Sequence, residues 1–281
     1  MFGTGTVVAE GRNRTRFLPY QVTNPGKDRD GVSIVIPAWN EEDRLARTLD
    51  RYIPSLEAHG GPFEVIVVVD GVRDRTADVA ATFVDHYVRV LSFPTKLGKG
   101  GAILAGLREA RFEYVGYLDA DGPISPEEMF TLVGDLKDVD CVVASRWIRG
   151  ASGADAEPLL NRVAGRAWNF LTRSLLFLPL GDTQAGAKFF KASVVRPMLH
   201  TVTLTNRAFD VDLLYHVRKA GRQVKEVPVQ WKYDPETRMP IGRAIPVMFV
   251  SLVGVRVMNS RVGKHIPPKL VHWFLSEFGG S

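Results

Sequence analysis

The sequence predicts an α/β protein built on a mostly parallel sheet with helices on both faces. The short apolar runs, such as 65–69, are hydrophobic throughout instead of alternating, which is typical of strands buried on both sides. Segments with helical patterning separate these runs. The 281 residues, 45% of them hydrophobic, suffice for one large domain or one domain with an appendage.

The first expected strand is at 32–36, and a proline break and a helix follow it. Asn40 is the expected N-cap of this helix, and the acidic residues 41–43 suit its positive end. Further strands are expected at 65–69, 88–93, 114–119, 140–145, within 181–192 and at 224–233, with helices between the first five and at 158–180 and 206–221.

The expected organisation has three parts. Residues 1–30 are polar and rich in Gly, Arg and Asn, which predicts a loose leader. Residues 31–235 form the main domain. Residues 236–281 form a tail with amphipathic helices that is suited to association with a membrane surface.

Charge and cysteine content narrow the possible partners and compartments. The formal net charge is +5 and the pI about 9.3, which suits an anionic partner. A single cysteine, Cys141, excludes an internal disulfide, fits a reducing compartment and is expected to be a small buried apolar residue. The longest uncharged run, 244–255, is shorter than the roughly 20 residues of a spanning helix. Residues 1–21 lack the apolar stretch of a secretory signal. We therefore expect a cytoplasmic protein, peripheral on the cytoplasmic membrane face.

Two acids, Asp119 and Asp121, lie one residue apart where the fourth expected strand ends. At ~4 Å two like charges repel by about 4 kcal/mol at an effective dielectric of ~20, so a cation should lie nearby. Carboxylates with substrate phosphates are the usual ligands of Mg²⁺, and Mn²⁺ has similar preferences. The alternative is a solvated turn whose acids cap the following helix.

Polar residues follow each of the first five strands. In a parallel sheet the carboxyl ends of the strands form the ligand-binding edge, so we expect these residues to converge. They are Asn40 and Glu41, Asp70, the segment 96–101, Asp119 with Asp121, and Ser145 with Arg146.

The glycine-rich segment "KLGKGGAILAG" allows two interpretations. It resembles a phosphate cradle in which Lys99 meets a diphosphate, although it lacks the P-loop pattern. Alternatively, its glycines let a helix pack closely on the sheet. The residues alone leave both open.

Arginines from several elements suggest an anionic acceptor, because guanidinium groups match phosphate geometry. Each one alone is more simply a surface residue. Together with neighbouring apolar segments they indicate a phosphate head with an apolar tail; they are Arg146, Arg162, Arg166, Arg207, Arg238 and Arg243.

The order of motifs resembles that of family 2 inverting glycosyltransferases with the GT-A fold, in particular dolichyl-phosphate β-glucosyltransferases and other polyprenyl-phosphate sugar synthases. The motifs are "SIVIPAWNEE", "EVIVVVDGVRDRT", "KLGKGGAILAG", "YLDADG", "VVASR", "GDTQAGAKFF" and "RAFDVDLLY". The resemblance covers about 33–231. "DTQAGAKFF" and "RAFDVDLLY" follow patterns typical of this subgroup.

The resemblance implies roles for individual residues. Asp119 and Asp121 would bind the metal on the donor diphosphate, Pro37, Asn40, Glu41 and Asp70 would form the nucleoside pocket, and Lys99 would approach the nucleotide. Ser145 and Arg146, with Arg162, Arg166, Arg207 and Arg238, would hold the lipid phosphate. Asp121, Asp182 and Arg146 would be catalytic, with Asp210 the rival of Asp182 for any base role.

Two departures concern the donor pocket. The family usually has an acid and a serine where this chain has Val69 and Val72. The function implied is metal-dependent transfer of a hexose, with inversion, from a donor of the UDP-glucose or GDP-mannose type to a polyprenyl phosphate at a membrane surface.

Two alternatives stay open at this point. The same donor chemistry could serve a soluble acceptor, or the chain could be an inactive nucleotide-binding module that docks on membranes. No nucleic-acid partner is expected, because no stacking platform accompanies the basic residues.

Overall fold

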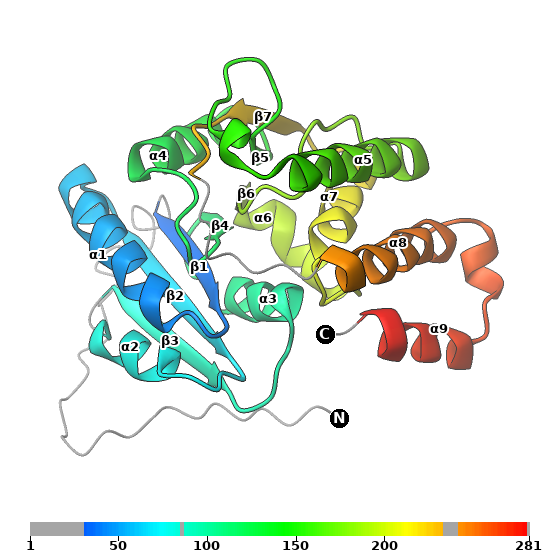
Figure 1. The fold of residues 1–281 in the computed structure, drawn as a ribbon, viewed down its shortest axis with the longest axis horizontal. Coiled ribbons are helices and arrows are strands. Elements are labelled where there is room, and N and C mark those ends of the chain that lie inside the picture. The colour runs from blue at the N-terminus through cyan, green and yellow to red at the C-terminus, as the bar shows by residue number, and fades with distance from the viewer. Residues whose placement is uncertain (1–30, 85–86, 233–240, 280–281) are drawn as a thin grey trace.

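The computed structural model describes residues 31–84, 87–232 and 241–279. Within these residues the sheet has seven strands in the order β3-β2-β1-β4-β6-β5-β7 (Figure 1). The predicted leader 1–30 lies outside the described residues, as does the predicted boundary between 235 and 236.

The strands confirm a mostly parallel sheet. In the described part of the chain β6 is the strand that runs antiparallel to its neighbours, β4 and β5. The loop before β6 lies at the carboxyl edge, so β6 starts there and runs back. The strands are β1 (Val32–Ala38), β2 (Phe63–Asp70), β3 (Val88–Phe93), β4 (Tyr114–Leu118), β5 (Cys141–Ser145), β6 (Ala187–Lys191) and β7 (Val224–Pro228).

Helices cover both faces of this sheet (Figure 1). On one face, residues of α1, α2 and α4 share a core cluster with alternate strand residues such as Ile34 and Val67. On the other, residues of α3, α5, α6, α7 and α8 share a second cluster with Val35, Val68 and Tyr117. The helices are α1 (Glu42–His59), α2 (Thr76–Thr82), α3 (Lys99–Glu109), α4 (Pro126–Asp135), α5 (Leu159–Leu176), α6 (Ala192–Val195), α7 (Phe209–Lys219), α8 (Ile241–Met258) and α9 (Pro268–Phe274), with short helical turns at Ala154–Ala156, Arg196–His200, Val262–His265 and Leu275–Gly279.

The prediction that Asn40 caps α1 is wrong by one residue. The N-cap is Glu41, and Asn40 has a left-handed backbone with φ 56°. The Asn40 Oδ1 atom instead accepts a hydrogen bond from the Arg73 backbone N–H at 2.9 Å. The side chain therefore joins the loops after β1 and β2. The prediction for Cys141 is confirmed, since it is buried in the core.

The C-terminal segment is tied to the loop that precedes α7. The Asn206 amide donates hydrogen bonds to Ser251 Oγ on α8 and to the Phe278 carbonyl, at 2.9 and 2.6 Å. The neighbouring Thr205 donates its backbone N–H to the Gly279 carbonyl at 2.7 Å. These bonds hold the end of the described chain beside the N-terminus of α3.

Two glycines in helices offer a matched test of packing. A Cβ on Gly106 in α3 would lie 2.4 Å from Val35 Cγ1, whereas a Cβ on Gly134 in α4 would meet nothing within 4 Å. We expect Gly106→Ala to lower the free energy of unfolding by roughly 1–3 kcal/mol through overpacking. Gly134→Ala should raise it by up to about 1 kcal/mol, because alanine favours the helix. Urea unfolding of both variants measures this, and equal effects would contradict it.

Candidate active site

Asp119 directly follows β4 at the carboxyl edge of the sheet. Its backbone N–H donates to the Gly186 carbonyl at 2.9 Å, which joins the ends of β4 and β6. A Cβ on Gly186 would lie 2.2 Å from Asp119 Oδ2. Glycine at 186 thus leaves the space that the Asp119 carboxylate occupies.

A lysine supplies the cation that the paired acids require. Lys99 Nζ at the start of α3 lies 2.7 Å from Asp119 Oδ1 and 3.0 Å from Oδ2. Burial lowers the pKa of Lys99, but the charges of Asp119 and Asp210 outweigh this and raise it. The ammonium group is therefore held charged against the carboxylate.

Side chains of α1 hold the loop that carries Asp119 and Asp121. The Thr48 hydroxyl donates to the Ala120 carbonyl at 2.7 Å, and Arg51 Nη2 donates to the carbonyls of Gly122 and Ile124. Because each bond fixes a backbone group, the loop between the acids and α4 has a defined path. Sequence reasoning missed these two residues, which carry no motif.

The acids around this loop fit a divalent cation whose remaining ligands come from a substrate. Glu41 lies close enough to Asp119 and Asp121 for both charges to raise its pKa. Within the described residues no three His, Cys, Asp or Glu side chains could hold a metal ion by themselves. Two carboxylates with substrate phosphates are the usual Mg²⁺ arrangement, so the donor set suits a metal–diphosphate complex.

The glycine-rich segment packs closely against the rest of the protein, as the second of its two interpretations predicts. The backbone N–H groups of Gly100 and Gly101 both donate to the Thr205 carbonyl, and those of Leu97 and Gly98 donate to the Asp70 carboxylate. A Cβ on Gly100 would lie 2.4 Å from Phe209 Cβ. These four amides are engaged within the protein, so from this segment the Lys99 ammonium is the group placed to meet a phosphate.

A hollow of about 490 Å³ opens beside the ends of β1, β2 and β3. Lys96 Nζ lies 3.6 Å from the centre of the Trp39 ring in a cation–π contact. Pro37 is half-buried near the end of β1, two residues before Trp39, which lines this hollow. The hollow's lining residues are Trp39, Gly71, Val72, Arg73, Pro94, Thr95 and Lys96.

Two residues of the predicted nucleoside pocket, Asp70 and Asn40, accept hydrogen bonds from backbone N–H groups of the loops around this hollow. Asp70 is buried, and burial raises its pKa although the amides of Leu97 and Gly98 oppose the shift. Asn40 binds Arg73 as described above. Val72, one of the family departures, lines the hollow itself. The hollow is thus bounded by residues that the motif-based assignment of the nucleoside pocket did not include, namely Trp39 and Lys96.

Arg146 and Asp182 form a buried ion pair. Arg146 Nε and Nη2 donate to the two carboxylate oxygens of Asp182 at 2.7 and 3.1 Å, and Arg146 Nη1 reaches Glu157 at 3.1 Å. The guanidinium also lies over the Trp231 ring at 4.9 Å. Burial raises the pKa of Asp182, but Arg146 outweighs it and the pKa is lowered. Asp182 therefore orients Arg146 in this structure, and its catalytic role stays a prediction.

Two further predicted residues are buried. Asp210 is 1% exposed and accepts hydrogen bonds from Lys188 Nζ, at 2.6 Å, and from the Tyr117 hydroxyl. Ser145 is completely buried on β5. Both side chains belong to the core in this structure, and the base role for Asp210 and the phosphate contact for Ser145 stay predictions.

The other predicted arginines fall into two groups. Arg162 pairs with Asp155 at 2.7 Å, and Arg166 lies over the Trp147 ring at 5.2 Å, both on α5. Arg207 is exposed before α7 and close enough to Lys96 and Lys99 to oppose their charges. Arg207 therefore lies near Lys96 and Lys99, and its contact with a lipid phosphate stays a prediction. Arg238 lies outside the described residues.

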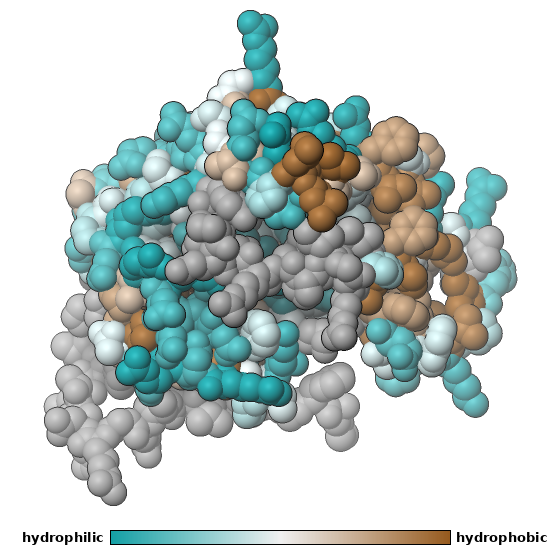
Figure 2. Space-filling view, viewed as in Figure 1, coloured by the Kyte–Doolittle hydropathy of each residue, from teal (hydrophilic) through white to brown (hydrophobic). Residues whose placement is uncertain are grey.

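An apolar surface extends from α5 to α8 and α9. On α5 the apolar side chains of Leu159, Val163 and Phe170 are 57–72% exposed. Figure 2 shows hydrophobic side chains gathered over α5 and α8. Leu160, Phe177, Phe249, Val253, Val257, Leu270 and Trp273 are also exposed. No described helix is both long enough and apolar enough to span a membrane.

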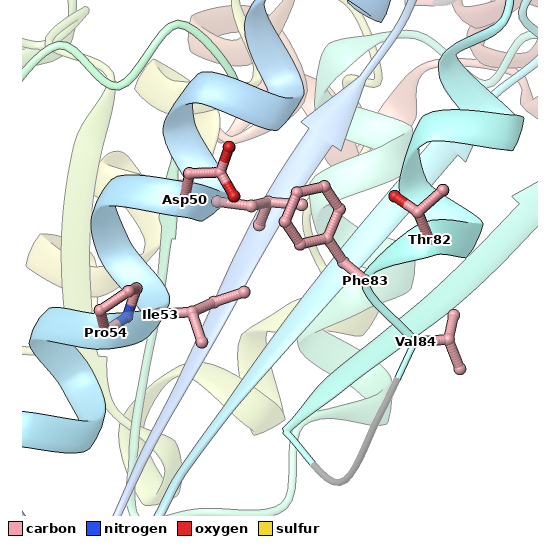
Figure 3. Close-up of a pocket in the computed structure, with 7 residues that line it drawn as sticks. Asp50, Ile53, Pro54, Thr82, Phe83 and Val84 are labelled. Carbon is pink, nitrogen blue, oxygen red and sulfur yellow. The ribbon is translucent and has the colours of Figure 1, made fainter.

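A second hollow, of about 210 Å³, lies between α1 and α2. Figure 3 shows Phe83 facing Ile53 across it, with Asp50 on the α1 side. None of the predicted site residues lines it.

The chain matches the model of Glycosyl transferase family 2 over residues 33–199, more than half its length, and therefore belongs to this family. It is 30% identical over 240 residues to a Trichomonas vaginalis dolichyl-phosphate beta-glucosyltransferase, covering 80% of this chain and 71% of that protein. It is 31% identical over 241 residues to the human dolichyl-phosphate beta-glucosyltransferase, covering 79% and 72%. It is also 31% identical over 204 residues to an undecaprenyl-phosphate mannosyltransferase of Micrococcus luteus, covering 70% and 82%.

Solved structures confirm the fold. A Mycobacterium tuberculosis glucosyl-3-phosphoglycerate synthase in complex with UDP superposes with a TM-score of 0.59 at 20% identity, covering 84% of this chain and 81% of that one. Another structure of that enzyme contains Mn²⁺, UDP and phosphoglyceric acid, at a TM-score of 0.59 and 19% identity, covering 81% and 77%. The fold is the GT-A fold of glycosyltransferases, and this protein is a glycosyltransferase of family 2.

The environment of Glu41 predicts a pH dependence of stability in the metal-free protein. Burial, opposed by Arg44 and reinforced by Asp121 and Asp119, raises the pKa of Glu41 from 4.5 to about 7. Between these values the folded state keeps a proton that the unfolded state releases, so this contribution to stability is present below pH 4.5 and lost as pH rises through 7.

We expect the free energy of unfolding in EDTA to fall by up to roughly 3 kcal/mol across this window because of Glu41. Glu41→Gln should remove that part of the fall. Glu57→Gln changes an exposed residue near the other end of α1. Its free energy of unfolding should fall with pH as that of the unmodified protein does. Urea unfolding at pH 5 and pH 8 measures both, and a Glu41→Gln curve parallel to that of the unmodified protein would contradict the assignment.

Proposed function

We propose that this protein is a metal-dependent inverting glycosyltransferase that moves a hexose from a nucleoside diphosphate sugar to a polyprenyl phosphate. The observation that carries the proposal is the cluster of Asp119, Asp121 and Lys99 at the carboxyl edge, beside the hollow at Trp39 and Lys96. It joins metal-ligating acids, a phosphate-binding cation and space for a nucleoside. The names of the relatives support the acceptor class.

On the donor side, the hollow would hold the nucleoside, with Trp39 and Lys96 against it. Asp119 and Asp121 would hold Mg²⁺ or Mn²⁺, which when bound supplies positive charge to the leaving diphosphate. Lys99 and Arg207 add fixed positive charge on the same side. Such preorganised charge favours the transition state, in which negative charge grows on the diphosphate.

On the acceptor side, the state of the acids favours a phosphate over a hydroxyl. A phosphate monoester has lost most of its second proton at pH 7, so the reaction needs no strong base. Asp182 has a lowered pKa and Asp210 is buried in an ion pair. Neither of these two candidate bases is therefore poised to accept a proton, which suits an acceptor that is already anionic.

The apolar surface supports a lipid acceptor over a soluble one. Arg162 and Arg166 lie on α5 beside the exposed Leu159, Val163 and Phe170. An interfacial helix combines apolar contact with basic residues that bind anionic headgroups. Arg166 contacts Trp147, the neighbour of Arg146, so this surface adjoins the proposed acceptor side. We propose that it rests on the cytoplasmic membrane face.

Transfer is tested with a panel of nucleotide sugars and short polyprenyl phosphates, with and without EDTA. We expect a lipid-linked monosaccharide that forms with Mg²⁺ or Mn²⁺, and a loss of at least about 100-fold in Asp121→Ala, the range of a lost electrostatic contribution. Full activity in EDTA would contradict the metal role. Transfer to water-soluble acceptors alone would contradict the lipid acceptor.

Membrane docking is tested by sedimentation with vesicles of phosphatidylcholine and phosphatidylglycerol. The Val163→Glu/Phe170→Glu double variant should bind at least about tenfold more weakly, because it places charge in the apolar contact. Val84→Glu alters a residue that is also exposed, near the α1–α2 hollow, and should bind like the unmodified protein. Equal loss in both, or none in either, would contradict docking through α5.

A further inference from the structure

Lys99 lies where a divalent cation on Asp119 would have to bind. Its Nζ contacts both carboxylate oxygens, at 2.7 and 3.0 Å. A cation bound to the same carboxylate would face the ammonium at close range, and like charges at such a distance repel strongly. Metal binding through Asp119 therefore requires Lys99 to move away.

We propose that Lys99 occupies the cation position on Asp119 until a metal ion and a diphosphate arrive together, so that metal binding depends on the nucleotide. The inference rests on the proposed donor chemistry and adds a role for Lys99 beyond contact with a phosphate. The Lys99 side chain would thus couple the binding of the metal ion to the binding of the nucleotide.

Exchange of partners explains the coupling. With both ligands present, the metal takes Asp119 and the diphosphate takes the Lys99 ammonium, so each charge keeps a partner. The metal alone leaves Lys99, which is 21% exposed, as an unpaired charge beside another cation. The nucleotide alone brings a diphosphate toward Asp119 and Asp121. Binding of either ligand alone is therefore disfavoured, whereas binding of the metal and the nucleotide together is favoured.

The surroundings restrict where Lys99 can go. Arg207 opposes the charge of Lys99, whereas Asp210 attracts it from the core side. The amides of Gly100 and Gly101 are bound to Thr205, which fixes the start of α3. The backbone therefore stays in place, and the exchange is a motion of the flexible lysine side chain alone.

The test measures Mn²⁺ binding from the signal of free Mn²⁺ in electron paramagnetic resonance. Without nucleotide, Lys99→Met should bind Mn²⁺ about tenfold more tightly than the unmodified protein, since the competing cation is gone. Adding UDP or GDP should raise Mn²⁺ affinity of the unmodified protein by about tenfold or more, and that of Lys99→Met by much less.

Lys96→Met is the matched control. It removes one positive charge three residues earlier, where Lys96 Nζ lies over the Trp39 ring while Lys99 Nζ contacts Asp119. Its Mn²⁺ affinity without nucleotide should stay within about threefold of the unmodified protein. Lys99→Gln, with thermal unfolding of all variants, guards against a folding defect in Lys99→Met and should repeat its result.

Two outcomes separate the inference from the function on which it rests. If Lys99→Met and Lys99→Gln bind Mn²⁺ alone no more tightly than the unmodified protein, the proposed role of Lys99 is wrong, whatever the nucleotide does. If neither UDP nor GDP changes Mn²⁺ binding to the unmodified protein, the proposed donor chemistry is wrong, and the variants without nucleotide still report on Lys99.

Discussion

The crowding of negative charge at the end of β4 is the constraint on which the site depends. Asp119, Asp121 and the nearby Glu41 share this edge beside positive charge, which Lys99 supplies to Asp119 from the start of α3 and Arg44 supplies to Glu41. That lysine is in position because Thr205 holds the amides behind it and because Gly100 lets α3 approach Phe209. Charge balance at the site therefore depends on the close packing of α3, because that packing positions Lys99.

The same balance recurs where the buried acids have no ligand to meet. Asp182 is neutralised by Arg146, and Asp210 by Lys188, each as a hydrogen-bonded ion pair. Removing either partner would leave an uncompensated buried charge, which is costly. The first pair fixes the position of Arg146, and the second joins β6 to α7. With both acids paired in this way, the proposed reaction depends on electrostatic stabilisation and on the orientation of the substrates.

The apolar surface of α5, α8 and α9 is the other departure from a simple globular domain. Exposed apolar groups are normal one at a time, but a continuous patch marks an interaction surface. Arg256, whose guanidinium lies over Phe177 at 5.1 Å, joins α8 to the end of α5. The C-terminal segment is also tied to Thr205 and Asn206, beside α3. The proposed membrane face and the proposed donor site are thus both bonded to the segment at Thr205 and Asn206.

The mostly parallel sheet and the convergence of Asp70, Lys99 and Asp119 at one edge followed from the sequence, because apolar strands and polar loop ends are local patterns. The reversed β6, the backbone capture by Thr48 and Arg51, and the burial of Ser145 and Asp210 did not. Each depends on partners far away in the chain, such as Lys188 for Asp210 and Ala120 for Thr48. A motif shows that an acid is present, but only tertiary packing decides whether it meets a ligand or a buried lysine.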